Sequence, residues 1–156
     1  MSKGAARERR NDMITTNIDI TIARPAAEVF EYISDFEKNP TWQNGMKSCR
    51  WITEPPLAVG SQYLQKAGFM GREINSTFEV IELTAGERVK AHTIESTFPI
   101  TFTRWVTPLG DDECRVQALI EGDSSGFFRI IEPLMAPLVR RSINKDYERL
   151  KALLEG

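Results

Sequence analysis

The sequence contains one histidine and two cysteines among its 156 residues. His92 and the distant Cys49 and Cys114 do not make a convincing zinc site, and two cysteines are too few for a disulfide-built scaffold. A formal net charge of −2 provides no global field that would attract nucleic acid or an anionic membrane. No apolar run approaches the roughly 20 residues of a transmembrane helix. We therefore expect no metal, no cofactor, no nucleic-acid partner and no stable membrane insertion.

The start of the chain also lacks the apolar stretch of a signal peptide. Residues 1–12 are polar and contain several arginines, so we expect a flexible tail there. Together with the low cysteine content, this predicts a cytoplasmic protein. The remaining residues, 13–156, have the length of one domain with a proper core.

The last thirty residues contain apolar side chains three or four positions apart, which places them on one side of a long helix. At about 1.5 Å per residue, such a helix is roughly 40 Å long, and it cannot bury its apolar side alone. Pro133 and Pro137 remove backbone donors, so we expect the helix to be broken, kinked or only beginning there. The uncharged stretch 133–139 fits either a buried helix start or an apolar gate over a cavity. The apolar side comprises Phe127, Phe128, Ile131, Met135, Val139, Ile143, Tyr147, Leu150 and Leu154.

The pattern of the region before this helix predicts β-strands. Residues 14–22 alternate isoleucine with polar residues, as in a half-buried strand. Pro25 suits the first turn of a short helix, and Asp35 is placed to cap a second one that continues through Pro40. Further strands are expected at 46–53, 60–67, 71–83, 87–95, 99–108 and 113–122. Their short connections allow only antiparallel neighbours, so the fold class is α+β.

Strand alternation predicts which side chains face the long helix. The expected inward faces are mostly apolar, but they include Ser76, Thr93 and Arg104, and buried polar groups are costly without partners. Arg104 therefore has two interpretations. In the first, it lies at a sheet edge or its strand is assigned to the wrong face. In the second, it anchors a ligand carboxylate or carbonyl inside a cavity.

The segment from Ile20 to Trp42 resembles the opening of the SRPBCC superfamily, in which a strand leads into a proline-started helix and then to Asp and Pro-x-Trp. Phe78–Glu82 and Leu150–Glu155 are similar to the family's mid-sheet strand and helix end, so the resemblance covers about residues 14–155. These are START-like lipid-transfer proteins and polyketide cyclases or dehydratases. The resemblance implies a helix-grip fold: a curved antiparallel sheet of about six to seven strands around a long C-terminal helix, two short helices after the first strand, and a hydrophobic cavity.

Nucleophilic serine chemistry is not supported. Residues 122–126 match the Gly-x-Ser-x-Gly pattern of hydrolases, but that pattern needs a histidine after the serine, and His92 precedes it. Helix capping by Ser124 or Ser125 explains the segment better. We assign no catalytic residue.

The favoured hypothesis is binding or transport of a lipid, polyketide or aromatic molecule in a cavity between the sheet and the last helix. The alternative is a cyclase or dehydratase in which Arg104, Tyr63 or His92 assists enolisation. It ranks second because no inward acid–base pair is recognisable, and whether the chain forms a homodimer stays open. The predicted ligand-binding residues are Phe30, Tyr63, Phe78, Phe102, Arg104, Leu134, Met135 and Leu138.

Overall fold

The computed structural model describes residues 13–69, 71–123 and 127–156, with only the backbone of residues 13, 123 and 127–134. The predicted tail (residues 1–12) and the proposed capping residues Ser124 and Ser125 lie outside the described residues. The elements are β1 (Met13–Ile22), α2 (Ala26–Ser34), the 3₁₀ helix η1 (Phe36–Thr41), β2 (Met46–Trp51), β3 (Gln62–Phe69), β4 (Arg72–Thr84), β5 (Arg88–Glu95), β6 (Ile100–Pro108), β7 (Cys114–Asp123) and α3 (Phe127–Glu155).

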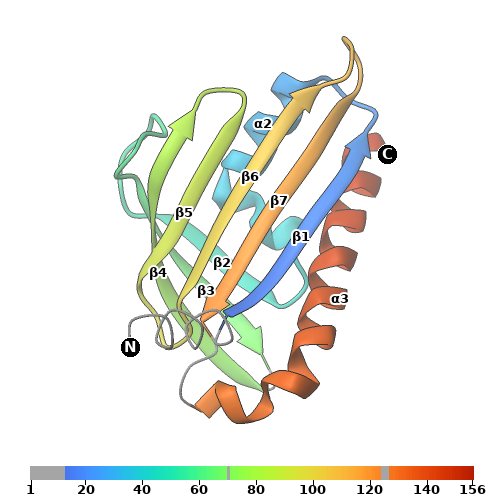
Figure 1. Ribbon diagram of the computed structural model, residues 1–156. Helices are drawn as coiled ribbons and strands as arrows, with labels where there is room; N and C mark the ends of the chain where they lie inside the picture. The colour runs from blue at the N-terminus through green and yellow to red at the C-terminus, as the bar shows by residue number, and fades with distance from the viewer. Residues whose placement is uncertain (1–12, 70, 124–126) are drawn as a thin grey trace, which may run out of the picture.

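The described strands form one antiparallel sheet in the order β1-β7-β6-β5-β4-β3-β2. All strands from β2 to β7 pair with their sequence neighbours because their connections are short. β1 closes the order by pairing with β7, from Met13 opposite Asp123 to Ile22 opposite Cys114. Figure 1 shows the sheet curled, with α3 running beside β1. This arrangement confirms the predicted helix-grip architecture.

The strand faces follow the predicted alternation. Ile14, Ile18 and Ile22 are buried, whereas Asn17 and Asp19 between them are exposed. The inward residues of β4, β5, β6 and β7 form one core with α2 and the C-terminal part of α3. Among the largest fully buried side chains of this core are Trp42, Tyr63, Phe36, Phe78, Ile33 and Leu150.

The helix α3 continues through both of its prolines. It is therefore not broken there, and it begins before Pro133, at Phe127. In Figure 1 its first part crosses the lower end of the sheet, and the rest turns to run along β1. A change of direction is expected where proline removes a helical hydrogen bond and crowds the preceding turn. Pro133 and Pro137 lie in this first part. The bend lets one helix both cover an end of the sheet and follow its edge.

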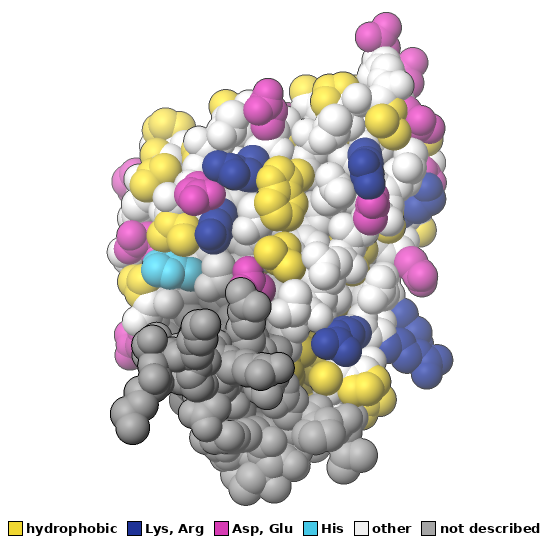
Figure 2. All heavy atoms as spheres, in the orientation of Figure 1, with side chains coloured by type: hydrophobic (Ala, Val, Ile, Leu, Met, Phe, Trp, Pro, Cys, Tyr) yellow, Lys and Arg dark blue, Asp and Glu magenta, His cyan; other side chains and the backbone are white. Residues whose placement is uncertain are grey.

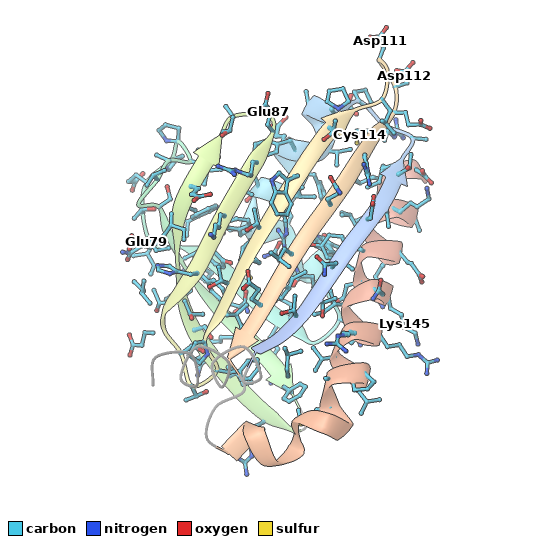
Figure 3. All side chains as sticks on the ribbon, in the orientation of Figure 1. Glu79, Glu87, Asp111, Asp112, Cys114 and Lys145 are labelled. Atoms are coloured by element: carbon cyan, nitrogen blue, oxygen red, sulfur yellow. The ribbon has the colours of Figure 1, made fainter. Side chains whose placement is uncertain are left out.

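Polar side chains of α3 attach the helix to the exposed edge of β1. Arg140 Nε donates to the Thr15 carbonyl oxygen at 3.0 Å, and Lys151 Nζ donates to the Thr21 carbonyl oxygen. These contacts satisfy acceptors that an edge strand would otherwise present to solvent. Lys145, by contrast, projects from α3 away from the sheet (Figure 3). The polar side of α3 is thus divided between solvent and the strand edge.

The predicted cap of the second helix is not formed. Asp35 occupies the position before η1, but its carboxylate makes no capping hydrogen bond. It accepts instead from Trp51 Nε1 at 3.4 Å. The side chain therefore links η1 to β2, because Trp51 lies on the neighbouring strand and offers an indole donor.

Candidate functional site

A cavity of about 240 Å³ lies between the concave face of the sheet and α3. β3, β4 and β6 contribute most of the sheet side, and residues 43–46 before and at the start of β2 contribute another wall. Met135, Val139 and Ile143, spaced four apart on α3, form the helix side. A concave, mainly apolar wall with a few polar groups is typical of sites for small hydrophobic molecules. Apolar lining residues from the sheet include Ile14, Ala67, Ile74, Ile100 and Ile120.

Packed aromatic rings fix one part of the cavity wall. Tyr63 and Phe78 stack with their ring centres 5.0 Å apart, and Phe78 lies 5.8 Å from Phe102. Behind them Phe36 contacts both Tyr63, at 4.7 Å, and Phe102, at 5.5 Å. Contacts at these separations hold rings in defined orientations. This wall is therefore preformed.

Arg104 lies in the same wall and is only 4% exposed. Its Nε donates to the Tyr147 hydroxyl at 3.1 Å. Its Nη1 donates to the Ile33 carbonyl oxygen at 2.8 Å and to Asn39 Oδ1 at 3.5 Å. The predicted inward direction of this arginine is confirmed, and the sheet-edge interpretation is wrong. One guanidinium joins β6 to α2, η1 and α3.

Tyr63 carries a hydroxyl without a protein partner. The residue is fully buried, and its oxygen makes no hydrogen bond to the described residues. Burial raises the pKa of Tyr63 well above its ordinary value, although the charge of Arg104 opposes this. The hydroxyl therefore keeps its proton at neutral pH, and protein atoms cover it.

Asp146 is the acidic residue of the cavity that the sequence analysis missed. Its Oδ1 accepts from the Asn44 backbone N–H at 2.9 Å and from Arg149 Nη1 at 3.2 Å. Burial nevertheless raises the pKa of this carboxyl, because desolvation outweighs both contacts. Helical spacing contained the signal, since Asp146 stands three residues after Ile143 and four before Leu150 on the buried side of α3.

The structure separates the eight predicted ligand-binding residues into three groups. Tyr63, Phe78, Phe102, Arg104 and Met135 line the cavity. Phe30 and Leu138 do not, and the side chain of Leu134 lies outside the described residues.

Phe30 and Leu138 miss the cavity for different physical reasons. Phe30 is buried in the core, where α2 packs on β6 and β7 and not opposite α3. Leu138 is 66% exposed, because the turn of α3 that directs Met135 and Val139 inward directs Leu138 outward. Their placement in the cavity was therefore wrong.

His92 does not take part in this site. It lies on β5 and is absent from the cavity wall, and Figure 2 shows its side chain on the outer face of the sheet. This position removes His92 from any acid–base role in the cavity. Within the described residues, no cluster of side chains is suited to hold a metal ion. None of the described helices is long and apolar enough to cross a membrane.

Comparisons with known proteins agree with this architecture. A family model described as polyketide cyclase / dehydrase and lipid transport matches residues 13–155. A search of curated proteins found no match. Three solved structures illustrate the shared fold, and at these identities the similarity concerns the fold alone.

A Thermus thermophilus protein aligns with a TM-score of 0.71 and 19% identity over 90% of this chain and 94% of its own. A START superfamily protein from Mycobacterium smegmatis aligns with a TM-score of 0.68 and 19% identity over 91% and 94% of the two chains. The Zhui aromatase/cyclase from a Streptomyces species aligns with a TM-score of 0.67 and 12% identity over 90% and 96%.

Proposed function

Since the chain belongs to the polyketide cyclase, dehydrase and lipid transport family, we propose that it binds one small hydrophobic molecule in the cavity between the sheet and α3. The observation that carries the proposal is the largely apolar wall in which ordered aromatic rings surround a few polar groups. A START superfamily protein and an aromatase/cyclase share this fold, which supports the proposal.

Burial of apolar surface provides the driving force. At about 25 cal/mol per Å², covering roughly 300 Å² of ligand contributes on the order of 7 kcal/mol before the costs of association. The rings of Tyr63, Phe78 and Phe102 are already held by one another, so little ordering is needed when a guest enters. A preorganised wall loses less affinity to side-chain ordering than a collapsed one.

Thermal unfolding with neutral straight-chain alcohols tests the proposal. Ligand at about 100 times its dissociation constant stabilises a protein by about 2.7 kcal/mol, which corresponds to a rise in Tm of roughly 5–10 °C at this chain length. We expect such a rise with decanol and a smaller one with hexanol. If no member of the series shifts the Tm, the binding proposal fails.

Two matched variants test whether the alcohol binds in the cavity. Ala67→Trp places a large ring in the cavity wall, whereas Leu64→Trp, on the same strand, changes the outer face, where Leu64 is 50% exposed. We expect Ala67→Trp to abolish the shift in Tm and Leu64→Trp to preserve it. Equal shifts in both variants would place the alcohol elsewhere.

A cyclase or dehydratase acting in the same cavity is the second candidate, and Asp146 is the observation that favours it. A carboxylate whose pKa is raised by burial is a stronger base than an exposed one. Exchange of α-protons for deuterium in a hydrophobic β-diketone, followed by NMR, tests this activity. The enzyme alternative predicts exchange faster than in buffer alone and its loss in Asp146→Asn. Wild-type protein that leaves the buffer rate unchanged would exclude enolisation of this ketone class.

A further inference from the structure

Arg104 is a buried cation without an anionic partner. A guanidinium carries a permanent positive charge in proteins. Every group that accepts its hydrogen bonds is neutral: a phenol, a backbone carbonyl and a side-chain amide. Among the described residues, no carboxylate forms an ion pair with it.

The surroundings of this charge are mainly aromatic. The guanidinium carbon lies 4.7 Å from the centre of the Phe102 ring, 5.0 Å from that of Trp42 and 5.6 Å from that of Phe36. Ring faces partly compensate a cation, but they provide no acceptor for its N–H groups. Buried charges in proteins are usually paired, so the remaining compensation has to come from the cavity.

The donors of Arg104 are unevenly used. Nε and Nη1 hold the side chain against α2, η1 and α3, whereas Nη2 makes no hydrogen bond to any described residue. The anchored nitrogens fix the guanidinium plane and therefore the direction of the unused donors. Because Arg104 lines the cavity, an acceptor on a bound molecule is the partner that this arrangement lacks.

The other polar groups near this charge are less available to a guest. The Tyr63 hydroxyl has no protein partner, but protein atoms cover it and it does not open onto the cavity. Asp146, the acidic group of the cavity, is already bonded to Asn44 and Arg149. Arg104 is therefore the group whose unused donor a guest in the cavity can meet.

We propose that the ligand is an apolar carboxylic acid whose carboxylate is bound by Arg104 Nη2. This inference rests on the proposed function, since it names the chemical class of the molecule in the same cavity. A charge-assisted hydrogen bond between a guanidinium and a carboxylate is stronger than a neutral one. The apolar remainder of the acid lies against the isoleucines of β4, β6 and β7.

Calorimetric titration of wild-type protein with decanoate, decanol and decanamide near neutral pH tests the inference. We expect decanoate to bind at least about tenfold more tightly than decanol or decanamide, as expected for recognition of the ionised group. Decanol or decanamide binding as tightly as decanoate would overturn the carboxylate assignment while leaving the proposed function standing. Absence of binding by all three would contradict both.

One variant and its surface control assign the preference to Arg104. The readout is the ratio of decanoate to decanol affinity, which a purely structural role would not change. Arg104→Gln should bring the ratio close to one. The exposed Arg115, paired with Asp19, gives the control: Arg115→Gln should leave the ratio unchanged.

Arg104→Gln also removes contacts that hold α2 and α3, and folding of this variant is checked by circular dichroism. If it does not fold, the wild-type ligand series still decides whether the ionised group is recognised. An unchanged affinity ratio in a folded Arg104→Gln variant would overturn the role given to Arg104.

Discussion

At the scale of single residues, Asp146 occupies a junction between α3 and the segment leading into β2. Its carboxylate accepts from the Asn44 backbone and from Arg149, and Arg149 Nη1 also donates to the Trp42 carbonyl oxygen at 2.9 Å. Burial still raises the pKa of Asp146, so the folded state binds a proton more readily than the unfolded state does. This group therefore destabilises the fold when it is ionised.

The sign of this effect gives a testable pH dependence. As pH falls through the raised pKa towards the ordinary value of 3.8, the Asp146 contribution to the free energy of unfolding should increase. The Asp146→Asn variant lacks this pH-dependent contribution to the free energy of unfolding. The stability of Asp146→Asn relative to wild type should therefore be greatest near neutral pH and should decline in acid. Urea unfolding of both proteins across this range measures the difference, and a difference that grows as pH falls would contradict the account.

The two cysteines should be inert in the folded protein. Burial raises the pKa of Cys49 to about 11 and also raises that of Cys114. Since only the thiolate reacts, labelling of native protein by a disulfide reagent at about pH 8 should be roughly a hundredfold slower than that of a free thiol. Unfolding in concentrated guanidinium chloride should expose both thiols to the reagent. Rapid labelling of native Cys49 would show that it is not buried as described.

At the scale of elements, the approach of Gly45 to β3 shapes one cavity wall. The Gly68 N–H donates to the Gly45 carbonyl oxygen at 2.7 Å, and Gly45 has a φ of +85°. A Cβ at Gly45 would also lie 3.1 Å from the Gly68 carbonyl oxygen. Only glycine combines this backbone conformation with so close a neighbour. The cavity wall formed by residues 43–46 therefore requires glycine, which has no side chain, at position 45.

Paired glycine substitutions separate these two effects. Gly86 has a φ of +77°, but its Cβ would meet nothing within 4 Å. Gly86→Ala should therefore cost about 1–2 kcal/mol for the left-handed backbone alone. Gly45→Ala should cost at least about 1 kcal/mol more because the backbone neighbour must also move. Chemical unfolding compares the variants, and equal costs would show that the contact with Gly68 is unimportant.

The first part of α3 should open more readily than the last. Pro133 and Pro137 offer no amide to the helix, and Leu138 is 66% exposed, whereas Leu150 is fully buried. Local opening is easiest where buried contacts are few. We expect amides of residues 127–139 to exchange hydrogen at least about tenfold faster than those of residues 143–154. Equal protection would remove the idea that this part of the helix acts as a gate for ligand entry.

At the scale of the whole molecule, the sequence predicted the architecture because its patterns are local. Alternation of apolar and polar residues predicted the inward faces of β1 and of β4 to β7, including Arg104. Short connections then allowed only antiparallel neighbours. The spacing of Met135, Val139 and Ile143 likewise predicted the helix side that faces the sheet.

Packing between distant segments was not predictable in this way. The partners of Arg104 are 43, 65 and 71 residues away, so no local pattern identifies them. The same limitation explains Phe30, whose apolar helix face was recognised but whose packing partner was not. The contribution of Asn44 and Gly45 depends on the close approach of the segment before β2 to α3 and to β3, which periodicity does not encode.

Both proposals require that an apolar guest occupies the space between the sheet and α3. Methyl NMR of isoleucine-labelled protein titrated with decanol shows whether it does. We expect saturable shifts and ligand contacts at the methyl groups of Ile74, Ile100 and Ile120, which line the cavity, and none at Ile52 and Ile94, which are 51% and 49% exposed. Decanol that leaves the three cavity methyl groups unchanged, or that contacts only the exposed pair, would contradict it.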